Sequence, residues 1–361
     1  MENLKQYIFQ YNRPNDSKVR LLIAGFCILV INLLGYFTGN YHINAVSSLG
    51  VFTFLHYTPN EGSRILKRMT FVGICLLSGY MLGMLSTVYI LMGPIIIALV
   101  GLVSRLLFRL FDIDKPGDLF VILCSAVGAS RPVSLSEIPE LSLLFIFGVV
   151  LSLIMGYVAL KIEGAPKQSL SFNLNLRERV RNNPRAMVDS VSYAITLFFA
   201  SYINLAIGLD QKSWLIVSAA AILQGNTLLQ MYGRNFQRII GTSLGLIVAI
   251  LLMFIPFTIE ARIALIVIVY VIVEYFMPRN YSIGIFFVTN MVMLQTTLTD
   301  PSIWPSIAHS RFFGIVIGSL IGAASAFIQY RLFDFYSQTI INERTYSPDN
   351  FKEHIDPNHS L

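Results

Sequence analysis

The stretch Arg234-Asn-Phe-Gln-Arg238-Ile-Ile-Gly241-Thr-Ser-Leu-Gly245 lies between two apolar runs and predicts how the rest of the chain is built. Two arginines four residues apart share one face of a helix. The Gly241-x-x-x-Gly245 spacing then bares a helix face, so that another helix can approach closely. A basic pair at the start of a helix, followed by a glycine packing face, predicts a membrane helix that is anchored at the membrane surface and lines a pathway.

The composition is that of an integral membrane protein. Of the 361 residues, 55% are hydrophobic and only 13% are charged, and the mean hydropathy is +0.65. A soluble domain has about a quarter charged residues, so this chain could not cover its surface in water. The net charge of +6 comes from basic residues in short loops between apolar runs, which gives no reason to expect a nucleic-acid partner.

The motifs of enzymes and metal sites are missing from the sequence. The three cysteines lie inside apolar runs, without the CxxC spacing of a redox or metal site, and the five histidines are scattered. There is no GxxxxGK[ST], no HExxH and no GxSxG. We therefore expect a protein that is not an enzyme and that uses no cofactor and no metal ion.

Apolar segments near the length of a membrane span, roughly 20 residues, follow one another along the chain. They predict an all-α polytopic bundle of about twelve spans. The segments are residues 20–38, 43–58, 69–87, 90–110, 118–133 and 141–161, then 185–206, 213–231, 237–257, 261–277, 281–298 and 309–332.

The distribution of positive charge predicts the orientation. With twelve spans and the N-terminus in the cytoplasm, all but four of the 26 Lys and Arg residues fall on the inner side. The exceptions are Arg131, Lys212, Arg262 and Arg311. This bias predicts that both termini are cytoplasmic.

The two halves read as a parallel repeat of six helices each. At a constant offset, Arg64 aligns with Arg234 and Arg68 with Arg238. The predicted divisions are a first membrane repeat, a basic cytoplasmic linker, a second membrane repeat and a polar cytoplasmic tail, at residues 1–161, 162–184, 185–333 and 334–361.

Small residues recur every fourth position in the last span of each half. Gly314, Gly318 and Gly322 form this pattern in the second half, as do Gly148, Ser152 and Gly156 in the first. With Gly241 and Gly245, they are predicted helix-packing positions. They could pack inside one chain or in a homodimer.

The basic pairs are the first candidates for a substrate pathway. Arg64 with Arg68, and Arg234 with Arg238, stand at the predicted cytoplasmic mouths of the third and ninth spans. Arginine pairs carboxylates bidentately, so such pairs suit a cationic entrance for organic anions. The alternative is that they anchor the protein to lipid headgroups.

Two charged residues inside the second half are further candidates. Arg311 stands on the outer side, where arginine is scarce, and is expected to face the pathway unless it snorkels to the interface. Asp189 is an intramembrane carboxylate and thus a functional candidate. A pair with Arg185 would equally explain it, as a pair with Arg279 would explain Glu274.

Three uncharged polar residues complete the candidates. Gln224, Tyr281 and Thr289 lie within predicted spans. Tyr281 could stack on an aromatic solute. The alternatives are hydrogen bonds between helices and an interfacial aromatic belt.

These residues resemble a known family. Ser213-Trp214-Leu-Ile-Val-Ser-Ala-Ala-Ala-Ile-Leu-Gln224, the Arg234 to Gly245 stretch, Asn280-Tyr281-Ser-Ile-Gly-Ile-Phe-Phe-Val-Thr289 and Arg311-Phe-Phe-Gly-Ile-Val-Ile-Gly318 resemble fusaric acid resistance-type (FUSC) membrane proteins. The match is good over residues 185–332 and loose over 20–161. It implies two six-helix repeats and export of organic anions, because the family includes aromatic acid exporters of the bacterial inner membrane.

We therefore expect an inner-membrane transporter that exports small organic, mainly aromatic, carboxylate anions, driven by the membrane potential or the proton motive force. A passive anion channel and a non-transporting envelope scaffold or assembly subunit are the two alternatives. The expected partners are organic anions, membrane lipid and a second copy of the chain or an accessory efflux subunit.

Overall fold

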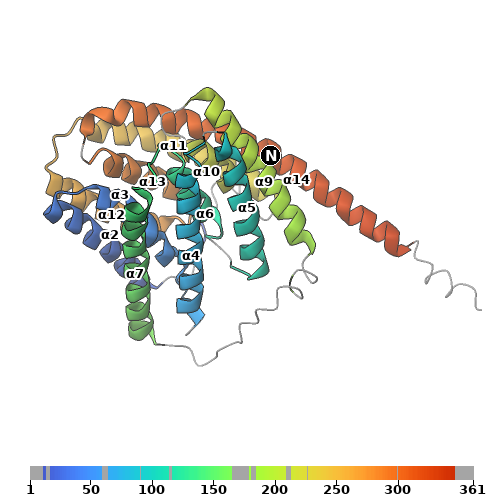
Figure 1. Ribbon diagram of the computed structural model, residues 1–361, viewed down its shortest axis with the longest axis horizontal. Helices are drawn as coiled ribbons and strands as arrows, with labels where there is room; N and C mark the ends of the chain where they lie inside the picture. Colours follow the sequence, from blue (N-terminus) through green and yellow to red (C-terminus); the bar gives the residue numbers. More distant parts are fainter. Residues whose placement is uncertain are drawn as a thin grey trace, which may run out of the picture.

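The chain forms a bundle of helices in the computed structural model (Figure 1). The structure describes residues 11–13, 17–58, 64–89, 91–113, 116–164, 179, 184–208, 213–225, 227–298 and 300–345. Over these residues it contains helices and turns and no strand, which confirms the predicted all-α class.

The helices follow the order of the predicted spans. The first half contributes α2 (Lys18–Thr38), α3 (His42–Val51), the 3-10 helix η1 (Phe52–His56), α4 (Arg64–Leu85), α5 (Met92–Leu110), α6 (Leu119–Gly128) and α7 (Ile138–Glu163). The second half contributes α9 (Pro184–Ile207), α10 (Ser213–Ile222), α11 (Leu228–Met253), α12 (Ile259–Phe276), α13 (Tyr281–Thr296), η2 (Pro301–Ile303) and α14 (Trp304–Thr345).

Seven of the described helices are long and apolar enough to cross a membrane: α2, α4, α5, α7, α9, α11 and the first part of α14. The expected count of twelve spans is not confirmed. Helices α3, α6 and α10 have ten residues each. At 1.5 Å per residue, each is about 15 Å long, half the thickness of a bilayer core.

The boundary between α10 and α11 differs most from the prediction. The predicted span 213–231 ends as a helix at Ile222, and α11 begins at Leu228 rather than at 237. The hydroxyl of Thr227 accepts a hydrogen bond from the backbone N–H of Gln230 and so caps the new helix. Arg234 and Arg238 therefore lie within α11 and not at its start, which corrects the predicted position at a helix entrance.

The predicted linker and tail fall mostly outside the described residues, which omit 165–178, 180–183 and 346–361. The last helix extends further than expected. It continues to Thr345, beyond the predicted domain end at 333. Figure 1 shows α14 running along the bundle and then projecting past the other helices.

The same pairs of helices pack together in both halves. In the first half α4 packs on α6 and α3 on α7, and in the second half α11 packs on α13 and α10 on α14. Helix α10 packs on α6 across the halves, and two matching interfaces also join them: α5 packs against α9, and α12 packs against α2. In each interface, the fourth helix of one half contacts the first helix of the other.

Glycines lie where these helix pairs approach most closely. A Cβ atom at Gly318 would collide with the carbonyl oxygen of Leu215 in α10, and one at Gly322 would lie 2.9 Å from the Cβ of Ile222. In the first half, a Cβ at Gly148 would collide with the carbonyl oxygen of Ser47 in α3. The small-residue faces of α7 and α14 thus pack inside the chain, which is the first of the two alternatives given for them.

Candidate functional site

Three arginines converge on α10 from two neighbouring helices. Arg234 and Arg238 come from α11, and Arg311 comes from α14. The three arginines and the residues whose side chains they contact form what we call the arginine cluster: Arg234, Arg238, Arg311, Trp214, Ser218, Tyr281 and Thr289.

Arg238 of α11 makes hydrogen bonds to two side chains of the cluster. Its side chain is buried, and its Nε donates to the hydroxyl of Ser218 at 3.0 Å. One of its terminal nitrogens donates to the hydroxyl of Tyr281 at 2.9 Å. Arg234 lies with its guanidinium carbon 4.3 Å from the centre of the Tyr281 ring, and its Nε donates to the carbonyl oxygen of Ala221 at 3.1 Å.

Arg311 is buried still more completely, with 1% of its surface exposed. Its guanidinium stacks on the ring of Trp214, 3.9 Å from the ring centre. One terminal nitrogen donates to the hydroxyl of Thr289 at 3.2 Å. Its Nε and its other terminal nitrogen have no hydrogen-bond partner among the described residues.

The contacts on α10 place the arginines one below another. Trp214 contacts Arg311, Ser218 contacts Arg238, and Ala221 contacts Arg234. Four residues of helix correspond to about 6 Å along its axis and three to about 4.5 Å. Arg311 was expected on the outer side and Arg238 on the inner side. Their contacts on α10 are only about one helical turn apart, so the structure brings both into one cluster.

Small residues make this approach possible. A Cβ at Gly245 would lie 2.9 Å from the Cβ of Thr289, and a Cβ at Gly314 would lie 3.1 Å from the Cβ of Trp214. Glycine at these positions lets α11 approach α13, and lets α14 approach α10. The guanidinium groups can then reach partners on two facing helices.

The cluster carries positive charge without a matching carboxylate. Within the part of the chain that the structure describes, none of its three guanidinium groups forms an ion pair with Asp or Glu. Arginine cannot give up its proton in a protein. A buried charge is costly unless it is paired. The arrangement is therefore suited to bind an anion, with N–H donors and aromatic faces on the same site.

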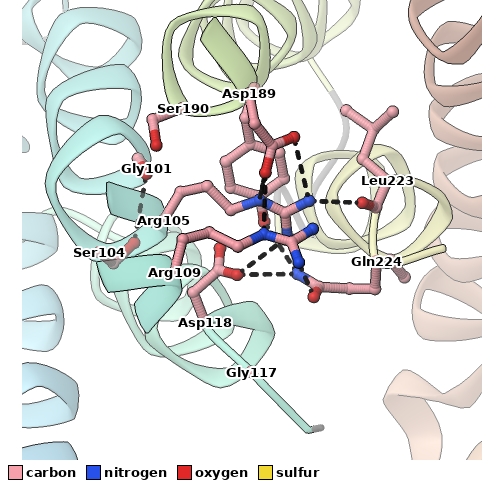
Figure 2. A network of polar contacts seen from close by, with 12 residues as sticks. Gly101, Ser104, Arg105, Arg109, Gly117, Asp118, Asp189, Ser190, Leu223 and Gln224 are labelled. Atoms are coloured by element: carbon pink, nitrogen blue, oxygen red, sulfur yellow. Dashed lines mark hydrogen bonds and ion pairs between the residues drawn. The ribbon is translucent and has the colours of Figure 1, made fainter. Parts of the chain in front are cut away.

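A second polar group, shown in Figure 2, has a different charge balance. Arg105 of α5 donates to Asp189 of α9 at 2.9 Å and to Asp118 at 3.1 Å. It also donates to the side-chain oxygen of Gln224 at 3.1 Å and to the carbonyl oxygen of Leu223 at 2.7 Å. We call this group the interface network; its members are Arg105, Arg109, Asp118, Asp189 and Gln224.

The interface network is charge-balanced and crosses between the halves. Arg109 donates to Asp189 at 2.9 Å, so two arginines face two aspartates. Gln224 also donates to Asp118, at 3.1 Å. In α14, Gln329 donates to Asp189. The structure thus places the pathway candidates Asp189 and Gln224 at the α5–α9 interface, outside the arginine cluster.

Arg64 and Arg68 occupy the first two turns of α4, in the opposite half from the cluster. The positions in the first half that match Arg311 and Tyr281 by the same offset are apolar, Leu141 and Phe111. The structure therefore brings together five of the predicted pathway residues, which are Arg234, Arg238, Arg311, Tyr281 and Thr289.

The sequence reasoning missed five residues of these two groups as site candidates: Trp214, Ser218, Arg105, Arg109 and Asp118. For the arginines a signal was present, because Arg105 and Arg109 have the same four-residue spacing as Arg234 and Arg238. For Asp189 and Glu274 the nearest basic residue in sequence was expected as the partner. The structure pairs Asp189 with Arg105 and Arg109 of the other half, and Glu274 with Arg20, at 3.3 Å.

Comparison with a family model concerns the half of the chain that contains the cluster. The model of the family described as "Fusaric acid resistance protein-like" matches residues 192–325. The uncharacterized membrane protein YvaC of Bacillus subtilis (strain 168) is 27% identical over 192 residues, which are 51% of this chain and 29% of YvaC. The chain thus spans less than a third of that relative's length. No solved structure matches the chain.

The matched range holds every residue of the arginine cluster. The resemblance inferred from the sequence is confirmed, because residues 192–325 of this membrane protein match the model of the fusaric acid resistance protein-like family.

Proposed function

We propose that this protein is a transporter that moves small organic anions, mainly aromatic carboxylates, out of the cytoplasm. The observation that carries the proposal is the arginine cluster: three guanidinium groups without a carboxylate partner among the described residues. Arginine recognises carboxylates through paired N–H donors. The family match over residues 192–325 supports transport as the role of this half.

The aromatic preference follows from the rings beside the arginines. Trp214 stacks on Arg311, and Tyr281 lies against Arg234. An aromatic acid that enters between them would place its carboxylate on N–H donors and its ring beside indole and phenol faces. In this proposal Tyr281 would stack on the ring of the solute.

The proposed architecture is two parallel repeats in an inner membrane, with both termini in the cytoplasm. The repeated helix pairs and the two matching interfaces between the halves support the repeat. The excess of Lys and Arg on one side supports the orientation. In this arrangement the short helices α3, α6 and α10 are buried among long ones and do not need to span the bilayer alone.

The membrane potential is a sufficient driving force for export. With the cell interior negative, a departing monovalent anion gains about 2.3 kcal/mol per 100 mV. That free energy sustains roughly a 50-fold concentration ratio. Coupling to protons is not required.

Removal of the charge on both α11 arginines tests the proposal. We expect an Arg234→Gln, Arg238→Gln double variant to lose organic-anion efflux from proteoliposomes by about a hundredfold or more, since each lost charged donor costs about 1.5–3 kcal/mol. The measurement is efflux of benzoate and of aliphatic carboxylates under an outside-positive potential. Arg262→Gln is the matched control, because Arg262 is buried in the same half, donates to the carbonyl oxygen of Thr297 and lies outside the cluster.

The outcomes separate the alternatives. Saturable efflux that the double variant loses supports a transporter, whereas efflux that rises linearly with concentration indicates a passive anion channel. If wild-type protein moves no carboxylate and instead co-purifies with a stable partner, the scaffold alternative holds. Equal flux in the double variant and in wild type would remove the cluster from the pathway.

A further inference from the structure

Among the buried arginines of the described residues, Arg105 and Arg311 have surroundings that can be compared directly. Arg105 is 2% exposed and Arg311 is 1% exposed. Arg105 has two aspartates, one glutamine oxygen and one carbonyl oxygen as acceptors. Arg311 has the Thr289 hydroxyl and the Trp214 ring, and two of its three nitrogens lack an acceptor among the described residues.

The partners of Arg311 hold it in place without neutralising it. The Thr289 hydroxyl donates to the carbonyl oxygen of Ile285 at 2.8 Å and accepts from Arg311, so its proton is already used inside α13. The Trp214 ring covers one face of the guanidinium. The N–H groups that remain point from the edge of the guanidinium plane, the geometry in which it binds anions.

The neighbouring guanidinium groups of Arg234 and Arg238 make the binding of an anion more favourable. Arg238 contacts α10 one turn from Trp214, and Arg234 contacts it three residues further on. Each repels Arg311, and none has a carboxylate partner in the described part of the chain. An anion that leaves the cluster without a replacement leaves three like charges in a low-dielectric interior.

We infer that the cluster binds a small inorganic monoanion, a halide, when no organic acid is present, and that the protein therefore works as an anion exchanger. This inference rests on the proposed function and adds the coupling partner. The organic anion leaves the cluster as a halide enters, because the state with three unneutralised arginines is the one that must be avoided. A one-for-one exchange of monovalent anions moves no net charge, so under exchange the halide gradient takes the place of the membrane potential as the driving force for export.

Halide binding is tested without any transport measurement. The chain has two tryptophans, so a Trp304→Phe variant leaves Trp214, which stacks on Arg311, as its single fluorophore. We expect iodide to quench this fluorescence saturably and chloride to compete with it, in a medium whose other anion is dextran sulfate, which is too large to enter. Adding Arg311→Gln should abolish the saturable phase, whereas adding Arg262→Gln should leave it unchanged.

Two results of this titration would overturn the inference. One is quenching that stays linear with iodide concentration, as for simple collision. The other is saturable quenching that persists in both the Arg311→Gln variant and an Arg311→Ala variant. If Arg311→Gln fails to fold, as judged by size-exclusion chromatography, Arg311→Lys is the second variant. It retains the charge but loses the planar fork, and the expected result is at least about tenfold weaker halide binding.

The exchange step is tested by efflux at zero membrane potential, clamped with potassium and valinomycin. Proteoliposomes loaded with benzoate are diluted into medium that contains either chloride or dextran sulfate. We expect efflux into chloride to be faster by about tenfold or more, a difference of about 1.4 kcal/mol in the barrier. Equal rates in the two media would overturn exchange and leave the proposed export function standing. No efflux in either medium would overturn both, whatever the titration shows.

Discussion

The interface network and the arginine cluster each contain a buried arginine, Arg105 and Arg311, but their charge balance differs. In the interface network, Arg105 lies between Asp118 and Asp189, and the group ties α5 to α9. In the cluster, Arg311 lies on Trp214 and Thr289, neither of which carries a negative charge. The carboxylates around Arg105 give it a structural role, whereas Arg311, with two nitrogens that lack an acceptor among the described residues, is the group proposed to bind a ligand.

The largest effect is expected from Arg105→Met. The change removes the cation shared by Asp118 and Asp189 and leaves both carboxylates buried. Loss of one partner from a buried pair costs about 3–5 kcal/mol, so the free energy of unfolding should fall by that order. Thermal unfolding in detergent, followed by size-exclusion chromatography, measures it. Arg109→Met is the control, and its free energy of unfolding should fall less because the Arg109 side chain is 38% exposed. Equal stability of wild type, Arg105→Met and Arg109→Met would show that the network is not a structural element.

The same substitution in the cluster, Arg311→Met, is expected to raise stability rather than lower it. Arg311→Met removes a buried charge with unsatisfied N–H groups, a penalty of about 1–3 kcal/mol. In medium with dextran sulfate as the anion, this variant should therefore unfold at a higher temperature than wild type. Added chloride should narrow the gap, because it stabilises wild type alone. If Arg311→Met is destabilised as much as Arg105→Met, the contrast between the two sites fails.

The smallest effect concerns the second interface between the halves. Arg20 of α2 pairs with Glu274 of α12, but the Arg20 side chain is 21% exposed. Partly exposed pairs contribute about 1 kcal/mol or less. We expect Arg20→Gln to lower the free energy of unfolding by no more than that, and less at high salt. A double-mutant cycle with Glu274→Gln measures the coupling; a value near that of the Arg105 pairs would mean that both interfaces are held by ion pairs.

The sequence was sufficient for the order and the approximate position of the helices. Apolar runs separated by charged loops leave little freedom in a membrane, where backbone groups must be satisfied inside each helix. Gly241, Gly245, Gly314 and Gly318 also carried information, because a repeated four-residue spacing shows which helix face is bare. The structure places these faces against neighbouring helices of the same chain.

The sequence was insufficient where a residue's role depends on another helix. Leu228 to Met231 read as the end of one span, although they open α11. Arg238 is accommodated inside that helix by Ser218 and Tyr281, and neither contact can be read from the local pattern. For Asp189 a pair with Arg185 was the alternative to a functional role, but its ion pairs with Arg105 and Arg109 span 84 and 80 positions.

Helix α14 connects the two regions through a single rigid rod. It carries Arg311 in the cluster and Gln329, which donates to Asp189 in the interface network. Eighteen residues separate them, which is five turns and about 27 Å, so both side chains leave the rod on the same side. The rod then extends a further sixteen residues beyond Gln329 to Thr345. Because α14 is one continuous helix, a displacement of its C-terminal end would move Arg311 and Gln329 together and so affect both the cluster and the network.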